Sequence, residues 1–176
     1  MSARTLIGYA TESGSTRSIA DRIGERLTGA GVPAELADLS AVKDSGRFEA
    51  LDAFDAFVLG SAVHGQAWLP VAREFVAAHR ALLGERPLWL FSVGMPGALR
   101  GPWRGLSEQE SPRILAGLGP LGPHEHRLFS GVISPAQLPP FGRFLFRVMG
   151  FRYGDYRDWP AVEAWADGIA RRLSAS

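Results

Sequence analysis

A hydroxyl-rich stretch, Thr11-Glu12-Ser13-Gly14-Ser15-Thr16, lies near the start of the chain between two contrasting patterns. The six residues before it, Thr5 to Ala10, are short and apolar enough for a buried β-strand. After it, apolar residues recur at helical spacing from Ile19 to Ala30. A strand, a loop and a helix start in this order point backbone N–H groups and the positive end of a helix dipole at one spot.

This stretch predicts a binding site for a phosphate group that uses no lysine. Four hydroxyl side chains surround the loop, and Gly14 permits a turn that a Cβ atom would hinder. The structural alternative is an ordinary helix N-cap, for which one or two hydroxyls would be typical. The stretch has neither the Gly-Lys-Ser/Thr ending of a nucleoside triphosphate loop nor the glycine pattern of a dinucleotide loop.

Strand and helix patterns alternate along the rest of the chain. Five strands separated by helices indicate a parallel sheet covered on both faces. Right-handed crossovers then give a doubly wound α/β three-layer sandwich, for which we expect the strand order 2-1-3-4-5 and one domain over 1–176. The strands are predicted at 5–10, 34–39, 54–61, 88–93 and 128–133, and helices after Thr16, from Pro70, around 107–118, after Pro140 and from about Asp158.

Composition narrows the classes of protein. No segment approaches the ~20 consecutive apolar residues of a membrane helix, and the chain leads at once into a strand, so we expect no signal peptide and a cytoplasmic protein. With 0 cysteines, disulfides, thiolate metal ligands and cysteine nucleophiles are excluded. The net charge is +1 and no basic stripe is interleaved with aromatic residues, so we expect no nucleic-acid partner.

The hydroxyl-rich stretch resembles the T-x-[ST]-G-x-T phosphate loop of the flavodoxin family at Thr11, Ser13, Gly14 and Thr16. In that family the loop holds the monophosphate of FMN. The resemblance therefore implies a flavodoxin-like fold with FMN as the cofactor, bound by all six residues from Thr11 to Thr16. Glu12 would face the phosphate with its backbone amide and turn its carboxylate to solvent.

The flavin ring would then meet the loops after the third and fourth strands, at the same edge of the sheet. Both loops carry small residues that let the backbone approach a flat ring, and Trp68, Met95 and Trp103 are bulky enough to cover it. The alternative is that these glycines and prolines only end the strands. The ring-contacting residues expected on this basis are Ala62, Val63, His64, Gly65, Ser92, Val93, Gly94 and Met95.

Three features are similar to the menaquinone-dependent protoporphyrinogen IX dehydrogenase branch of this family. They are the phosphate loop, the run Gly60 to Gly65 leading into a helix with Arg73 to Val76, and the segment Gly131 to Asp158. The resemblance implies an FMN-dependent oxidoreductase with a quinone or another small redox substrate. Family members carry a basic insertion after the fourth strand, where this chain has the Gly- and Pro-rich segment Gly94 to His126.

Other functions stay open at this point. A one-electron carrier that meets a redox protein is disfavoured because the chain lacks the strongly acidic surface of such flavodoxins. A flavodoxin-like module without flavin, and a deazaflavin in place of FMN, are further alternatives. We expect no metal site and no obligatory catalytic side chain. His64 could donate to the flavin, His79 is expected at the edge of the core, and His124 and His126 are interpreted as surface residues.

The aromatic and basic segment Phe141 to Tyr153 is the second candidate surface. We expect its helix to pack on the sheet while Arg143 and Arg147 extend to water. The alternative is a helix at a membrane interface that collects a quinone, which would make the protein peripheral at the inner face of the membrane. The helical period alone does not separate the two.

Overall fold

The structure of the protein is a computed structural model that describes residues 3–41, 51–94, 112–137, 139–148, 150 and 152–175. Its main sheet has the strand order β2-β1-β3-β5-β6, and neighbours along this path are parallel. The predicted order 2-1-3-4-5 is therefore confirmed. The strands are β1 (Thr5–Ala10), β2 (Ala34–Asp38), β3 (Ala56–His64), β5 (Leu88–Gly94) and β6 (Glu125–Ser130), and the short β4 (Ala67–Trp68) pairs antiparallel with β3.

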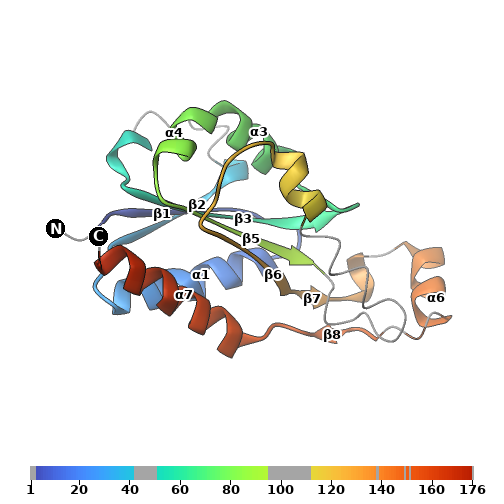
Figure 1. The fold of residues 1–176 in the computed structure, drawn as a ribbon. Coiled ribbons are helices and arrows are strands. Elements are labelled where there is room, and N and C mark those ends of the chain that lie inside the picture. Colours follow the sequence, from blue (N-terminus) through green and yellow to red (C-terminus); the bar gives the residue numbers. More distant parts are fainter. Residues whose placement is uncertain are drawn as a thin grey trace.

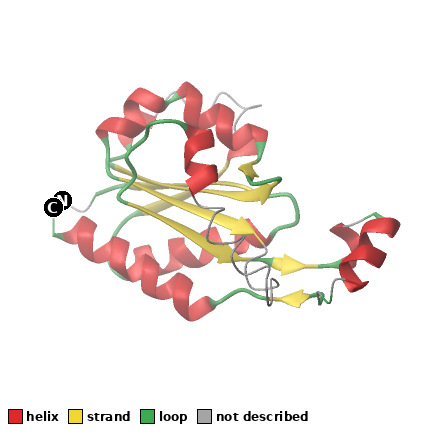
Figure 2. Ribbon diagram, turned by 45° about the vertical axis from the view of Figure 1, so that its right-hand side comes forward, coloured by secondary structure: helices red, strands yellow, loops and turns green. Residues whose placement is uncertain are grey.

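Helices cover both faces of this sheet, which gives the three layers of a flavodoxin-like α/β fold (Figure 1). α1 (Ser15–Gly29) and α7 (Trp159–Ser174) lie on one face, and α3 (Pro70–Ala78) and α4 (Arg80–Glu85) lie on the other. Figure 2 shows the same layers from a second direction, with both chain ends at one end of the sheet. The carboxyl ends of the strands point to the opposite end, where the candidate site lies.

The two halves of the core follow from the alternation of side chains along each strand. In β1 every residue is buried: Ile7 and Tyr9 join the cluster under α1 and α7, while Leu6 and Ala10 join the cluster under α3. A strand buried on both faces is mostly apolar, which explains why the sequence from Leu6 to Ala10 shows no polar alternation.

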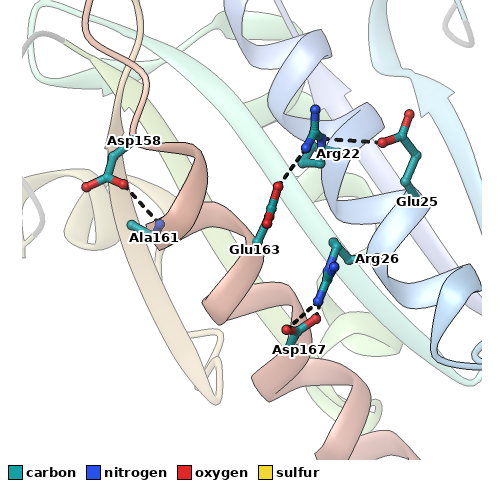
Figure 3. Close-up of polar contacts among 7 residues, drawn as sticks. All are labelled: Arg22, Glu25, Arg26, Asp158, Ala161, Glu163 and Asp167. Carbon is teal, nitrogen blue, oxygen red and sulfur yellow. Dashed lines mark hydrogen bonds and ion pairs between the residues drawn. The ribbon is translucent and has the colours of Figure 1, made fainter.

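Charged pairs fix α7 beside α1 (Figure 3). Arg22 meets Glu163 at 2.6 Å, and Arg26 donates two hydrogen bonds of 2.9 and 2.7 Å to the Asp167 carboxylate. These side chains are partly exposed, so solvent screens both pairs and each contributes little to stability. The apolar contacts beneath them supply most of the attraction between the helices.

The structure corrects several predicted boundaries. The expected loop 62–68 is a hairpin, because β3 continues to His64 and turns back into β4. The predicted helix from Pro70 is divided into α3 and α4 at His79, whose φ of −113° is not helical. The last predicted strand begins earlier, at Glu125, and is interrupted at Gly131 before β7 (Val132–Ile133). Residues 95–111 include the predicted loop and the start of the 107–118 helix, and lie outside the described residues.

The helix expected to pack on the sheet is the largest difference. α6 (Pro140–Val148) lies beyond the end of the sheet, joined to it by β7 and by β8 (Gly154–Asp155). β7 and β8 pair with each other, so the helix packs on this ribbon through Phe146 instead of on the central layers. The prediction of a helix buried against the sheet is therefore wrong.

A hydrogen-bonded chain of three side chains lies within the α3 side of the core. The indole N–H of Trp68 donates to Ser92 Oγ at 2.7 Å, and Ser92 Oγ lies 2.8 Å from His126 Nε2. When the imidazole is neutral, the Ser92 hydroxyl can donate its own proton to Nε2 and continue the chain. His126 was expected at the surface, but its burial lowers its pKa from 6.5 to about 4.

This burial predicts a pH dependence of stability. Because the folded pKa of His126 is depressed, the unfolded chain takes up a proton first as the pH falls from 6.5 towards 4, and up to about 3 kcal/mol of stability is lost over that window. The free energy of unfolding measured in urea at pH 7.5 and pH 4.5 should fall less for His126→Gln than for the natural protein. His124→Gln, on the exposed neighbour, should keep the full dependence. An unchanged pH dependence in His126→Gln would contradict this account.

Gly60 predicts a second effect on stability. It pairs with Phe91 across β3 and β5, and a Cβ atom on it would lie 2.0 Å from Cζ of the Phe91 ring. Gly60→Ala should therefore lower the free energy of unfolding by about 1–3 kcal/mol, because a buried ring in a packed core has little room to move. Gly84→Ala, where nothing lies within 4 Å of the new atom, is the matched control and should be neutral or stabilising. Equal urea midpoints for both variants would refute the prediction.

Candidate functional site

The hydroxyl-rich stretch forms the turn between β1 and α1. Gly14 has a φ of 88°, the left-handed conformation that glycine adopts without strain, and it is the N-cap of α1. Its backbone N–H donates to Thr11 Oγ1 at 3.0 Å, so Thr11 shapes the turn as well as lining it. The turn leaves the N–H groups of the first turn of α1 without intrahelical partners. Such groups, together with the helix dipole, attract an anion.

Thr16 carries the clearest signal in this turn. The residue is 1% exposed, and its Oγ1 has no hydrogen-bond partner among the residues that the structure describes. A buried hydroxyl without a partner costs about 1–3 kcal/mol, and buried polar groups in proteins are nearly always paired. This hydroxyl therefore fits an acceptor that the protein itself does not supply, such as a phosphate oxygen.

The remaining residues of the stretch have different surroundings. Ser13 and Gly14 are exposed. Ser15 is buried, and its Oγ accepts a hydrogen bond of 3.1 Å from the backbone N–H of Val132 in β7. The Ser15 hydroxyl therefore ties the turn to the ribbon that carries α6, a role that no local pattern indicates because the partners are 117 residues apart.

Glu12 and His64 come together across the edge of the sheet. Glu12 Oε2 lies 2.6 Å from His64 Nε2, and both side chains are more than half exposed. The Glu12 carboxylate is thus held by the last residue of β3 while its backbone remains in the turn. Sequence reasoning placed both residues at this edge but did not foresee that they meet.

The loop after β3 is a two-residue hairpin turn. Gly65 and Gln66 have φ values of 56° and 64°, and His64 pairs with Ala67 across the turn. Two successive positive φ values match the twist of the strands in a tight hairpin. A positive φ is sterically unfavourable for a residue with a side chain such as Gln66. The Oε1 of Gln66 accepts a hydrogen bond of 2.6 Å from Arg113. Ala62 and Val63 are half-buried just before the turn.

The end of β5 lies beside this hairpin. Ala62 pairs with Val93, and Ser61 pairs with both Ala10 and Ser92, so the three carboxyl ends are adjacent. Val93 is buried and Gly94 is half-buried, while Met95 and Trp103 lie outside the described residues. The side chain of Ser92 is occupied by Trp68 and His126. Trp68 is 2% exposed and belongs to the core, so the expectation that its indole covers a ring is wrong.

The structure therefore brings the hydroxyl-rich turn together with the hairpin after β3 and the end of β5. The turn offers helix amides and a buried hydroxyl, which suit a phosphate, and the two strand ends offer backbone and small side chains, which suit the edge of a flat ring. Among the described residues no group of three or more His, Cys, Asp or Glu side chains could hold a metal ion. His79 lies at the edge of the core against Phe75, as expected, and burial lowers its pKa.

Comparisons with known proteins agree with this fold. A curated relative, "Protoporphyrinogen IX dehydrogenase [quinone]" of Escherichia coli (strain K12), is 23% identical over 177 residues, covering 95% of this chain and 94% of the relative. A flavodoxin from the domain Archaea superposes with a TM-score of 0.54 at 14% identity, over 97% of this chain and 99% of the other.

Longer proteins contain the same fold. Rubredoxin oxygen:oxidoreductase of Desulfovibrio gigas superposes with a TM-score of 0.58 at 18% identity, over 98% of this chain, and this chain spans about a third (36%) of its length. These likenesses show the fold. The family model described as "Flavodoxin domain" matches residues 6–155, and the chain therefore belongs to the flavodoxin domain family.

Proposed function

We propose that this protein binds FMN at the turn between β1 and α1 and acts as a quinone-dependent oxidoreductase. Its Escherichia coli relative, whose name joins protoporphyrinogen IX with a quinone, is the precedent for the substrate class. Bound FMN would supply hydride or single-electron transfer, and the chain would supply the binding site and its electrostatics.

The observation that carries the FMN part is the buried Thr16 hydroxyl at the start of α1. Its Oγ1 has no partner among the described residues, and the residue lies two positions after the left-handed Gly14 in a turn typical of phosphate sites. The helix amides and this hydroxyl would hold the phosphate. Glu12, held by His64, would keep its negative charge turned away from the phosphate.

The hairpin and the end of β5 would determine how the ring lies. Backbone groups of Val63 to Gly65 and of Val93 to Gly94 are at the sheet edge and would contact the ring edge. Val93 is buried, and a Cβ atom on Gly131 would lie 3.0 Å from its Cγ1, so the two residues are closely packed. Met95, which lies outside the described residues, is proposed as a further ring contact.

A one-electron carrier is the second candidate. The net charge of +1 argues against it, because carriers of this kind use an acidic field to attract basic partners. The third candidate is an interaction module that binds no flavin. It would give the buried Thr16 hydroxyl no hydrogen-bond partner.

Thr16→Val tests the cofactor site. Valine keeps the shape of threonine and removes the hydroxyl, so FMN affinity measured by fluorescence titration should fall about ten- to hundred-fold, the effect of one hydrogen bond to a charged group. The urea stability of the flavin-free protein should stay the same or rise, because an unpaired buried polar group is removed. Thr16→Ser keeps a hydroxyl and should retain most of the affinity. FMN binding of natural strength in Thr16→Val would contradict the assignment.

Electron transfer to a quinone is tested separately. After anaerobic reduction of the bound flavin, stopped-flow mixing with menadione should give oxidation whose rate rises with quinone concentration and exceeds that of the same concentration of free reduced FMN. The one-electron carrier would be favoured instead if the bound flavin exchanges electrons only with a ferredoxin reductase and the quinone oxidises it no faster than it oxidises free reduced FMN.

A further inference from the structure

We propose that α6 and its ribbon form a docking surface for an anionic lipid membrane. The surface, called the α6 arm below, comprises residues 131–156, with β7 and β8 as its stem. Figures 1 and 2 both place α6 beyond the carboxyl end of the sheet, away from the helical layers and from both chain ends. The helix is therefore presented at one extremity of the molecule.

The arm has a small interior of its own. Ile133, Phe146, Tyr153 and Tyr156 pack together, and the Phe146 and Tyr153 rings stack with centroids 4.9 Å apart. The stem is paired between Val132 and Asp155 and between Ile133 and Gly154. Phe146 is thus the side chain through which α6 packs on its stem, and it is the one residue of the helix that is buried.

The outer face of α6 is apolar and exposed. Four apolar residues, separated by three, four and seven positions from the first of them, lie on one side of the helix, opposite Phe146. These residues are Phe141, Phe144, Leu145 and Val148, which are 76%, 66%, 46% and 66% exposed.

The arm carries a net positive charge. Residues 131–156 contain three arginines and one acidic residue, Asp155, which pairs with Arg157 at the base of the stem, although the whole chain has a net charge of only +1. Arg143 and Arg147 are exposed on α6 one turn apart, and Arg152 is exposed near the stem. A short helix with aromatic residues on one face and arginines on another is the pattern that lies in the headgroup region of anionic membranes.

The helix lies on a membrane in this account and does not cross it. α6 has 9 residues, a length of ~14 Å, against a hydrocarbon core of about 30 Å. No helix among the described residues is long and apolar enough to span a bilayer.

A second copy of the chain is a poorer occupant. The four exposed side chains offer about 450 Å² in all, given that one aromatic side chain buries 150–250 Å², whereas a stable interface needs about 800 Å² from each partner. Pairing two arms would also bring arginines of the same sign together. A membrane carries the complementary charge and accepts a protruding apolar tip without a preformed groove.

The arm is tied directly to the phosphate turn. Val132 in the stem donates its backbone N–H to Ser15 Oγ, and Arg157, the residue after the arm, donates from Nη1 to Ser18 Oγ in α1 at 2.8 Å. A protein docked through α6 would thus hold the candidate flavin site near the bilayer that dissolves quinones. This link to quinones rests on the proposed function, whereas membrane docking itself does not.

Flotation of the full chain with lipid vesicles tests the proposal. The protein should float with vesicles containing 30% phosphatidylglycerol, and bind at least ten-fold more weakly to pure phosphatidylcholine or at 0.5 M salt, because the charge attraction is lost or screened. Phe141→Ser with Phe144→Ser should abolish flotation. Arg143→Gln with Arg147→Gln should weaken it about twenty-five-fold, at about five-fold for each arginine near the surface.

Matched controls separate the arm from general charge and from flavin binding. Arg171→Gln with Arg172→Gln removes the same charge at the far end of α7 and should leave flotation unchanged. The arm variants should keep the flavin content of the natural protein, and Thr16→Val should keep flotation, so that failure of either proposal is recognised separately. The proposal would be overturned if the natural protein does not float with the vesicles. It would also be overturned if the Arg143 and Arg147 variant and the Arg171 and Arg172 variant lose flotation equally. A dimer in light scattering that disappears in Phe141→Ser with Phe144→Ser would overturn it too.

Discussion

The left-handed turn at Gly14 is the constraint on which the rest of the candidate site depends. It lets a fully buried strand pass directly into a helix, so that the first amides of α1 open at the carboxyl end of the sheet. This arrangement places the polar groups of a helix start at the edge of an apolar core, where they need hydrogen-bond partners. Thr11 Oγ1 accepts a hydrogen bond from the Gly14 N–H, while the Thr16 hydroxyl is buried without a partner among the described residues.

Much of the fold and the position of the candidate site could be predicted from the sequence because they depend on local patterns. The apolar run of β1, the hydroxyls of the turn and the alternation of strands with helices each extend over a few neighbouring residues, and together they are sufficient for the sheet order. The pairing of Glu12 with His64 and of Ser15 with Val132 could not be predicted, because it depends on how distant segments meet. Trp68 was misjudged because an aromatic residue near a strand end can serve the core as readily as a ligand, and its N–H found Ser92 inside.

The helix α6 shows where periodicity stops being informative. A helical spacing of apolar residues predicts one buried face, but it does not say what covers that face. Here Gly131 interrupts the last strand, the stem turns away from the sheet, and the apolar face remains exposed while Phe146 alone packs inward. The stem also donates a hydrogen bond to Ser15, so the proposed membrane surface is joined directly to the proposed cofactor turn.

The central claim is that the start of α1 exists to hold the phosphate of a flavin, and a crystal structure of the protein grown with FMN tests it most directly. The account predicts a phosphate oxygen within hydrogen-bond distance of Thr16 Oγ1 and of the first amides of α1, with the ring between the hairpin after β3 and the end of β5. A turn occupied only by water, with FMN absent or bound elsewhere, would contradict it.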